Sequence, residues 1–182
     1  MSKYFKHFKM ILKHKWFVFK ACCRAGIIWR GIMHDMSKFS PIEFFESGRY
    51  FTGKSSPIDV AKKTQGVSYA WQHHKGRNPH HWEYWVDNLS DGGVGRPMPY
   101  KYALEMICDY IGAGQAYEGS DWSFDRPYDY WAEERAFRAK IHPSTLEFID
   151  SIFWTIKEEQ NYNALSKSYT KSVYKYAMEG LA

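Results

Sequence analysis

The sequence predicts an all-α protein, a single domain spanning residues 1–182 and built as a bundle of about six or seven helices. Apolar residues recur at intervals of three and four over long stretches, and helix-capping motifs precede two of these stretches. No segment alternates apolar and polar residues over the length of a strand. A chain of 182 residues with 45% hydrophobic residues is also large enough to bury one core.

The first half of the chain carries several helix signals. Residues 4–24 have an amphipathic pattern, and residues 27–33 form a second apolar stretch. The segment SPIE at residues 40–43 is a capping box with proline at the first helical position, so a third helix should begin there. Residues 47–58 are expected to form a loop, and residues 59–71 another helix.

The second half begins with a long irregular stretch, residues 73–99, which exceeds the usual length of a connection and is therefore a candidate functional loop. Later helices are expected over residues 100–117, residues 128–141, residues 144–160 and the last 20 residues. The third of these starts with a second capping box, Ser144 to Glu147. The polar motifs described below lie in residues 10–117, on which the helices of residues 128–180 should pack.

The basic charge of the chain is concentrated at its N-terminus. The net charge is +5, but residues 1–20 contain six lysines and no acidic residue, so the remainder sums to −1. This local pattern disfavours a protein coated in positive charge, and a nucleic-acid partner is possible without being favoured. A solvated helix face is the simplest interpretation of the lysines, and contact with phosphate or a membrane surface is the alternative.

Cysteine content and hydropathy lead us to expect a cytoplasmic protein. Cys22, Cys23 and Cys108 are odd in number and form no CxxC pair, so neither a disulfide framework nor a thiolate zinc site is predicted. No uncharged apolar run approaches the length of about 18 residues that a membrane span needs, so stable membrane insertion is not expected.

Histidines and aspartates form the main chemical signal. Four of the eight histidines lie within nine residues of the segment WQHHKGRNPHHWEYW, and they are His73, His74, His80 and His81. His14 and Asp109 lie among apolar residues of expected helices, where an unpaired polar group is costly. Imidazoles and carboxylates without nearby thiolates bind Zn, Fe, Mn, Ni or Co, so the sequence predicts one or two divalent transition-metal ions.

Each of these residues also has an ordinary interpretation. His14 could be a core histidine that bonds to a backbone carbonyl, and Asp109 could pair with Arg24 or Arg30. The adjacent His34 and Asp35 could cap a helix end. The loop histidines cannot all be metal ligands, and the others would bond to loop carbonyls or contact substrate.

The order of the polar residues resembles the HD superfamily of metal-dependent phosphohydrolases, which are all-helical proteins with an H…HD…D set of metal ligands. The matching residues are His14, the His34-Asp35 pair in IMHDMSKF, the loop histidines and Asp109. The resemblance implies a first metal bound by His14, His34, Asp35 and Asp109. It also implies that Asp35 bridges to a second metal held by His74, His80 and His81. Lys38 matches an HDxxK form, in which the lysine often approaches a substrate phosphate.

A wider set of motifs is similar to a family of uncharacterised proteins of phages and bacteria. These motifs are HDxSKFSPxEF, HHxxxNPHHWE and EMxCD, and they cover about residues 10–110. This second resemblance implies no activity.

The expected function is therefore a metal-dependent phosphohydrolase that acts through a metal-activated water. Asp35 and Lys38 are candidate catalytic residues. Glu83 and Glu105 are candidate acid–base groups or outer partners of the metal ligands.

The expected substrate is a nucleotide or a small phosphorylated molecule. Lys38, Lys75 and Arg77 would neutralise phosphate oxygens. Trp82, or alternatively Trp71 or Trp85, would stack on a base, and this favours a nucleotide over a sugar phosphate.

Two other functions are compatible with the sequence. One is a non-catalytic protein with a structural metal or none, which binds a nucleotide or a host factor. The other, less favoured, is an HNH-type nuclease, which needs a β-hairpin at HHKGRNPHHWEYWVDNL and leaves His14 and Asp109 without a role.

Overall fold

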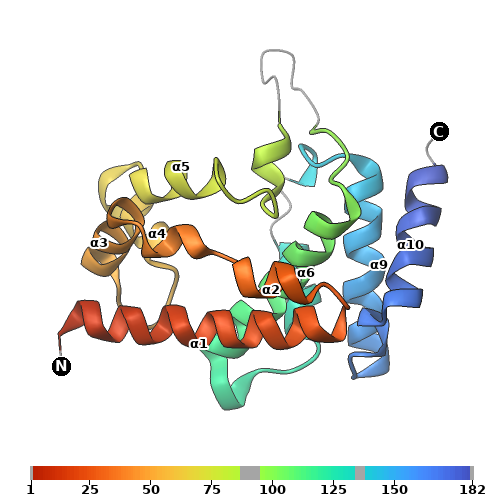
Figure 1. Cartoon of the computed structure of the whole chain (residues 1–182), viewed down its shortest axis with the longest axis horizontal. Coiled ribbons are helices and arrows are strands. Elements are labelled where there is room, and N and C mark those ends of the chain that lie inside the picture. Colours follow the sequence, from red (N-terminus) through yellow and green to blue (C-terminus); the bar gives the residue numbers. More distant parts are fainter. Residues whose placement is uncertain (1, 87–94, 134–137, 181–182) are drawn as a thin grey trace.

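Helix α1 (Lys3–Arg24) is the longest element and runs along the lower edge of the molecule in Figure 1. The computed structural model describes residues 2–86, 95–133 and 138–180. The other α-helices are α2 (Ile28–Met33), α3 (Pro41–Tyr50), α4 (Pro57–Gln65), α5 (Tyr69–Lys75), α6 (Tyr100–Glu118), α7 (Arg126–Glu133), α9 (Pro143–Glu159) and α10 (Lys167–Glu179). Short 3-10 turns are η1 (Met36–Phe39), η2 (Trp82–Trp85), η3 (Gly119–Asp121) and η4 (Asn163–Leu165). Every regular element of this part of the chain is helical, which confirms the all-α class.

The described residues contain nine α-helices, more than the six or seven expected, and the helix expected over residues 59–71 is divided into two of them. Gly66 ends α4 in the left-handed region with φ 80°, which favours glycine. The Ser68 side chain then accepts a hydrogen bond from the Trp71 backbone N–H at 3.1 Å and starts α5. Because α5 continues to Lys75, His73 and His74 lie on a helix instead of in the irregular stretch.

Other boundaries differ by smaller amounts. Ser40 caps α3 as predicted, and α3 extends to Tyr50, four residues into the expected loop. Helix α9 begins at Pro143, because the His142 side chain, and not Ser144, accepts the capping hydrogen bond. Helix α7 covers the first part of the helix expected over residues 128–141, of which residues 134–137 lie outside the described residues.

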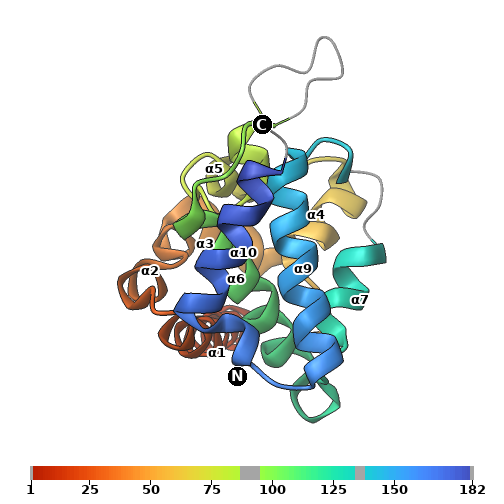
Figure 2. The ribbon, with the colours of Figure 1, turned by 90° about the vertical axis from the view of Figure 1, so that its right-hand side faces the viewer.

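The core lies between α1, α6 and the C-terminal helices. Helix α6 is packed against α1, α9 and α10, and its buried apolar residues include Leu104, Ile107 and Ile111. Figure 2 shows α9 and α10 side by side on the C-terminal flank. Large rings fill this region: Trp131, Phe148 and Phe153 are completely buried. The aromatic content of the chain is thus used in part to build its core. No helix among the described residues has the length and apolar character needed to cross a membrane.

Helices α1 and α6 come into very close contact at Gly112. A Cβ atom added to Gly112 would lie 2.4 Å from Val18 Cγ2 and 2.7 Å from the Val18 backbone nitrogen. The same two helices carry His14 and Asp109, one turn away from this contact. Glycine at position 112 therefore sets the spacing between two of the predicted metal ligands.

We expect Gly112→Ala to lower the free energy of unfolding by about 1–3 kcal/mol, because backbone atoms of Val18 cannot move away from the new methyl group. Gly76→Ala is the matched control: Gly76 has φ −74°, and its added Cβ would meet the Gln72 carbonyl at an ordinary 3.5 Å. Urea denaturation of both variants measures the difference. Equal stabilities would contradict the close helix contact.

Candidate metal centre

The fold brings all the predicted metal ligands together in one centre. They are His14 on α1, His34 and Asp35 after α2, His74 on α5, His80 and His81 before η2, and Asp109 on α6. His81 and Asp109 are half-buried, and the others are buried. His14 and Asp109 are 95 positions apart in the chain, and they meet because α1 and α6 are in contact.

The first ligand group consists of His14, His34, Asp35 and Asp109. His14 Nε2 lies 3.3 Å from His34 Nε2, 3.4 Å from Asp35 Oδ2 and 3.1 Å from Asp109 Oδ1. His34 Nε2 lies 3.2 Å from Asp35 Oδ2 and 3.3 Å from Asp109 Oδ1. Four N and O ligands around a tetrahedral zinc ion are about 3.3 Å apart. The spacing of these atoms fits a transition-metal ion.

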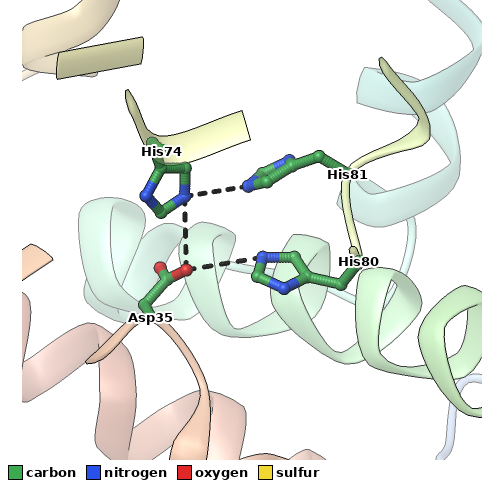
Figure 3. Close-up of side chains that lie close together, drawn as sticks. All are labelled: Asp35, His74, His80 and His81. Carbon is green, nitrogen blue, oxygen red and sulfur yellow. Dashed lines mark hydrogen bonds and ion pairs between the residues drawn. The ribbon is translucent and has the colours of Figure 1, made fainter. Parts of the chain in front are cut away.

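The second ligand group consists of Asp35, His74, His80 and His81 (Figure 3). Asp35 Oδ1 lies 3.3 Å from His74 Nε2 and 3.4 Å from His80 Nε2. His74 Nε2 lies 2.9 Å from His81 Nε2. This group is therefore also able to hold a metal ion.

Asp35 connects the two groups by its two oxygen atoms. Oδ2 contacts the histidines of the first group, and Oδ1 contacts His74 and His80 of the second. Its backbone has φ 53°, a left-handed conformation that aspartate tolerates better than most residues. Asp35 lies between α2 and η1, and its left-handed backbone conformation turns the short side chain into the centre.

Glu105 on α6 contacts one histidine from each group and hydrogen-bonds to that of the first group, His34. Its Oε1 lies 3.1 Å from His34 Nδ1 and 3.4 Å from His80 Nδ1. Its Oε2 accepts a hydrogen bond from Arg30 Nε at 2.6 Å and forms an ion pair with Arg30 Nη2, also at 2.6 Å. A carboxylate at Nδ1 keeps the proton on that nitrogen and directs the lone pair of Nε2 to the metal position. Glu105 thus lies behind the ligands.

Glu43 has the same role toward α5, although the sequence does not mark it as a partner of the histidines. Its Oε2 lies 2.7 Å from His74 Nδ1, and its Oε1 lies 2.6 Å from His73 Nδ1. Glu43 was interpreted only as the last residue of the capping box. Its backbone N–H does bond to Ser40 Oγ at 3.5 Å, but its carboxylate points to the histidines. Burial of Glu43 is the signal that separates the two roles, and sequence alone does not reveal it.

Several buried atoms of the centre lack ordinary hydrogen bonds. Neither oxygen of Asp35 and neither ring nitrogen of His80 has a partner in hydrogen-bond geometry among the described residues. Leaving a buried polar group unsatisfied costs about 1–3 kcal/mol, and more for a charged group. A cation bound between these atoms would give each of them a partner. It would also be a partner for the nitrogen atoms of the other histidines, which point to the same place.

Charge also makes the centre receptive to cations. Burial raises the pKa of a carboxyl group, but the neighbouring histidines and Lys38 outweigh burial and hold the pKa of Asp35 well below its usual value. The pKa of Asp109 is likewise lowered by His34 and His14, against the effect of burial. For Glu105, the neighbouring His34 and His80 overcome burial and lower the pKa to about 2. All three carboxylates are therefore ionised at neutral pH.

The pKa values of His34 and His74 shift in the opposite direction to that of His81. Burial disfavours their charged form, but the carboxylates of Asp35 and Asp109 raise the pKa of His34 well above its usual value. Asp35 and Glu43 raise the pKa of His74 against burial. His81 is different, because burial and the neighbouring His80 and His74 together hold its pKa well below the usual value. His81 thus offers a neutral imidazole.

The predicted substrate-binding residues are not all equally close to the centre. Lys38 Nζ lies 2.6 Å from Asp35 Oδ2, and Asp35 and Asp109 raise the lysine pKa despite burial. Lys75 ends α5 and Arg77 is exposed after it, and neither pairs with a carboxylate among the described residues. Trp82 packs against the hydrophobic core, and Glu83 is half-buried on η2.

The Trp71 ring contacts two of the ligand histidines. Its ring centroid lies 5.9 Å from that of His74 and 5.0 Å from that of His81. Lys62 Nζ lies 4.8 Å from the Trp71 centroid. Trp85 instead donates its indole N–H to the Pro79 carbonyl at 2.7 Å.

This geometry does not fit the HNH alternative. The segment expected to form a β-hairpin has α5 and η2 in its described part, residues 73–86. His14 and Asp109, which that alternative leaves without a role, lie beside His34.

Residues 3–155 match the family model of DUF5662, a family of unknown function. The chain belongs to DUF5662. The DUF5662 region contains both ligand groups as well as Glu43 and Glu105, whereas α10 lies beyond it. No curated protein and no solved structure matches the chain.

We expect Asp35→Asn to lower metal content in both ligand groups, because the amide loses the charge and one metal-binding oxygen of the bridging residue. Asparagine also tolerates φ 53°, so the backbone is preserved. Elemental mass spectrometry of protein purified without chelator or histidine tag measures the loss. Asp121→Asn, on η3, is the control. Unchanged metal content in Asp35→Asn would contradict the shared-ligand arrangement.

Metal affinity should fall on acidification. Because the pKa values of His34 and His74 are raised in the metal-free protein, both imidazoles keep protons that a metal has to displace. Below each raised pKa, affinity should fall roughly tenfold per pH unit for each proton displaced, and above it the dependence should disappear. Titrations with Zn²⁺ or Mn²⁺ between about pH 6 and 8.5 test this, and a flat profile would count against it.

Proposed function

We propose that this protein is a metal-dependent phosphohydrolase of HD type, which hydrolyses a nucleotide or a small phosphorylated molecule. The observation that carries the proposal is the division of the Asp35 carboxylate between two ligand groups, with three further ligands on each side. Sites with two metals bridged by a carboxylate are suited to displacement at phosphorus, where negative charge has to be stabilised on several oxygens.

One or two divalent ions of Fe, Mn, Zn, Ni or Co would polarise a phosphoryl oxygen and lower the pKa of a water molecule. The donor set supports this choice, because both groups consist of imidazoles and carboxylates and include no cysteine. Glu43 and Glu105 would hold the imidazoles in the tautomer that binds metal.

Lys38 is the side chain best placed to bind a substrate phosphate. Its side chain is 28% exposed, and its ammonium group contacts the bridging Asp35. A positive charge at this position would neutralise a non-bridging phosphate oxygen and stabilise the charge that develops in the transition state. Lys75 and Arg77 lie on the same histidine-bearing segment and would contact more distant phosphates of the substrate.

The half-buried ring of Trp71 favours a nucleotide, because it lies against His74 and His81 and could stack on a base. Trp82 would contribute to the wall of the site from η2, and Glu83 remains an acid–base candidate. Glu105 would act as a positioning residue, since its oxygens face Arg30 and the Nδ1 atoms of the histidines. Three unpaired cysteines are compatible with a cytoplasmic enzyme.

The metal-loaded protein should hydrolyse at least one member of a panel of nucleotides, sugar phosphates and p-nitrophenyl phosphate. We expect Lys38→Gln to lower kcat/KM roughly 100-fold while metal content stays at the wild-type level, because the variant loses charge stabilisation and keeps every ligand. Lys171→Gln, on α10, is the control and should leave kcat/KM unchanged.

Two results would contradict the proposal. A protein with both metal positions filled that hydrolyses nothing in the panel would favour the non-catalytic alternative. Equal activity of Lys38→Gln and wild type would remove the assigned role of Lys38.

A further inference from the structure

A large set of apolar side chains is exposed on one side of the molecule. We call it the α1–α3 apolar face, and each member is at least 36% exposed: Phe5, Phe8, Leu12, Trp16, Ile28, Trp29, Ile32, Met33, Met36, Phe39, Ile42 and Phe45. Scattered exposed apolar residues are ordinary, but a contiguous set of this size usually marks an interaction surface. None of these residues belongs to either ligand group.

Side-chain contacts link members of this face across α1, α2, η1 and α3. The Phe8 ring lies 6.2 Å from Phe39, and Tyr4 connects α1 to Phe45 at 6.0 Å. Between α1 and α2 lies a groove of about 240 Å³, lined by Leu12, Lys15, Trp16, Phe19, Gly31 and Ile32. Figure 2 shows α1, α2 and α3 gathered on one side, away from α7.

Positive charge surrounds this face. Residues 2–45, which span the face, contain nine Lys and Arg residues, and seven of them remain when Arg30 and Lys38, which pair with Glu105 and Asp35, are set aside. The two acidic residues of this range, Asp35 and Glu43, are buried. Lys9 Nζ lies 4.9 Å from the centroid of the Phe5 ring, and Lys20 Nζ lies 5.9 Å from that of Trp16. The lysine stems can thus lie along apolar surface while their ammonium groups reach outward.

This charge pattern selects among the surfaces that could cover the face. A second copy of the chain in a two-fold dimer would bring equal positive charges together. A nucleic acid would satisfy the lysines but would leave Ile28, Ile32 and Met33 uncovered. An anionic bilayer satisfies both, because aromatic and aliphatic side chains enter the headgroup region while lysines contact lipid phosphates.

We propose that the α1–α3 apolar face docks on the surface of an anionic phospholipid bilayer. The helices lie in the interface without crossing the membrane. This inference does not depend on the proposed catalytic activity, because the metal ligands of α1 lie on the opposite, buried side of that helix.

Vesicle sedimentation tests the proposal with the full chain. The probes are phosphatidylcholine vesicles with and without about 30% phosphatidylglycerol. We expect at least roughly tenfold tighter binding to the anionic vesicles, with most of this preference lost when salt is raised from about 0.1 M to about 0.5 M.

Two variants separate the apolar and charged contributions. Trp29→Ser combined with Ile32→Ser should reduce binding roughly tenfold, whereas Trp154→Ser, which removes a 49% exposed tryptophan from α9, should not. Lys9→Glu combined with Lys20→Glu should abolish the preference for anionic lipid, whereas Lys171→Glu combined with Lys175→Glu on α10 should preserve it. Circular dichroism establishes that each variant is folded.

The proposal is overturned if folded wild-type protein binds neither kind of vesicle. It is also overturned if the protein sediments as a dimer that Trp29→Ser with Ile32→Ser dissociates, because the face would then be a contact between copies. Binding to both vesicle types with equal affinity would contradict the role of the lysines.

Discussion

The carboxylate of Asp35 is the interaction on which the rest of the centre depends. It is 1% exposed, and burying a carboxylate is costly unless cationic or hydrogen-bonding groups surround it. Histidines contact each of its oxygens, and Lys38 approaches from η1. The close crossing of α1 and α6 and the attachment of α5 to α3 serve to bring these groups around one anion.

Charge balance explains why His34 and His74 have raised pKa values without metal. The centre and its outer partners contain four carboxylates, from Asp35, Asp109, Glu43 and Glu105, against the cations Lys38 and Arg30. With neutral histidines this leaves two negative charges. Protons on the imidazoles supply the missing positive charge, and a divalent metal ion would supply the same charge while using the nitrogen lone pairs.

Sequence patterns predicted the helical class and the residues that meet in the centre, but not the contacts around them. Helical spacing predicts α1 and α6, and residue type with order selects His14 and Asp109. The groups that support the ligands from behind were harder to find, because Glu43 lies in a motif with a sufficient local explanation and Arg30 pairs with Glu105, 75 positions away. Helix boundaries near Gly66 also depended on backbone conformations that residue patterns describe poorly.

The separation of the ligands along the chain has a consequence for folding. The first ligand group joins residues from α1, the turn after α2 and α6, so an unfolded chain cannot present it as a unit. An ion that binds only the folded state stabilises that state by about 2.7 kcal/mol when its concentration is 100 times its dissociation constant. Metal supply would then govern how much of this protein survives proteolysis in the cell, independently of any reaction that the centre catalyses.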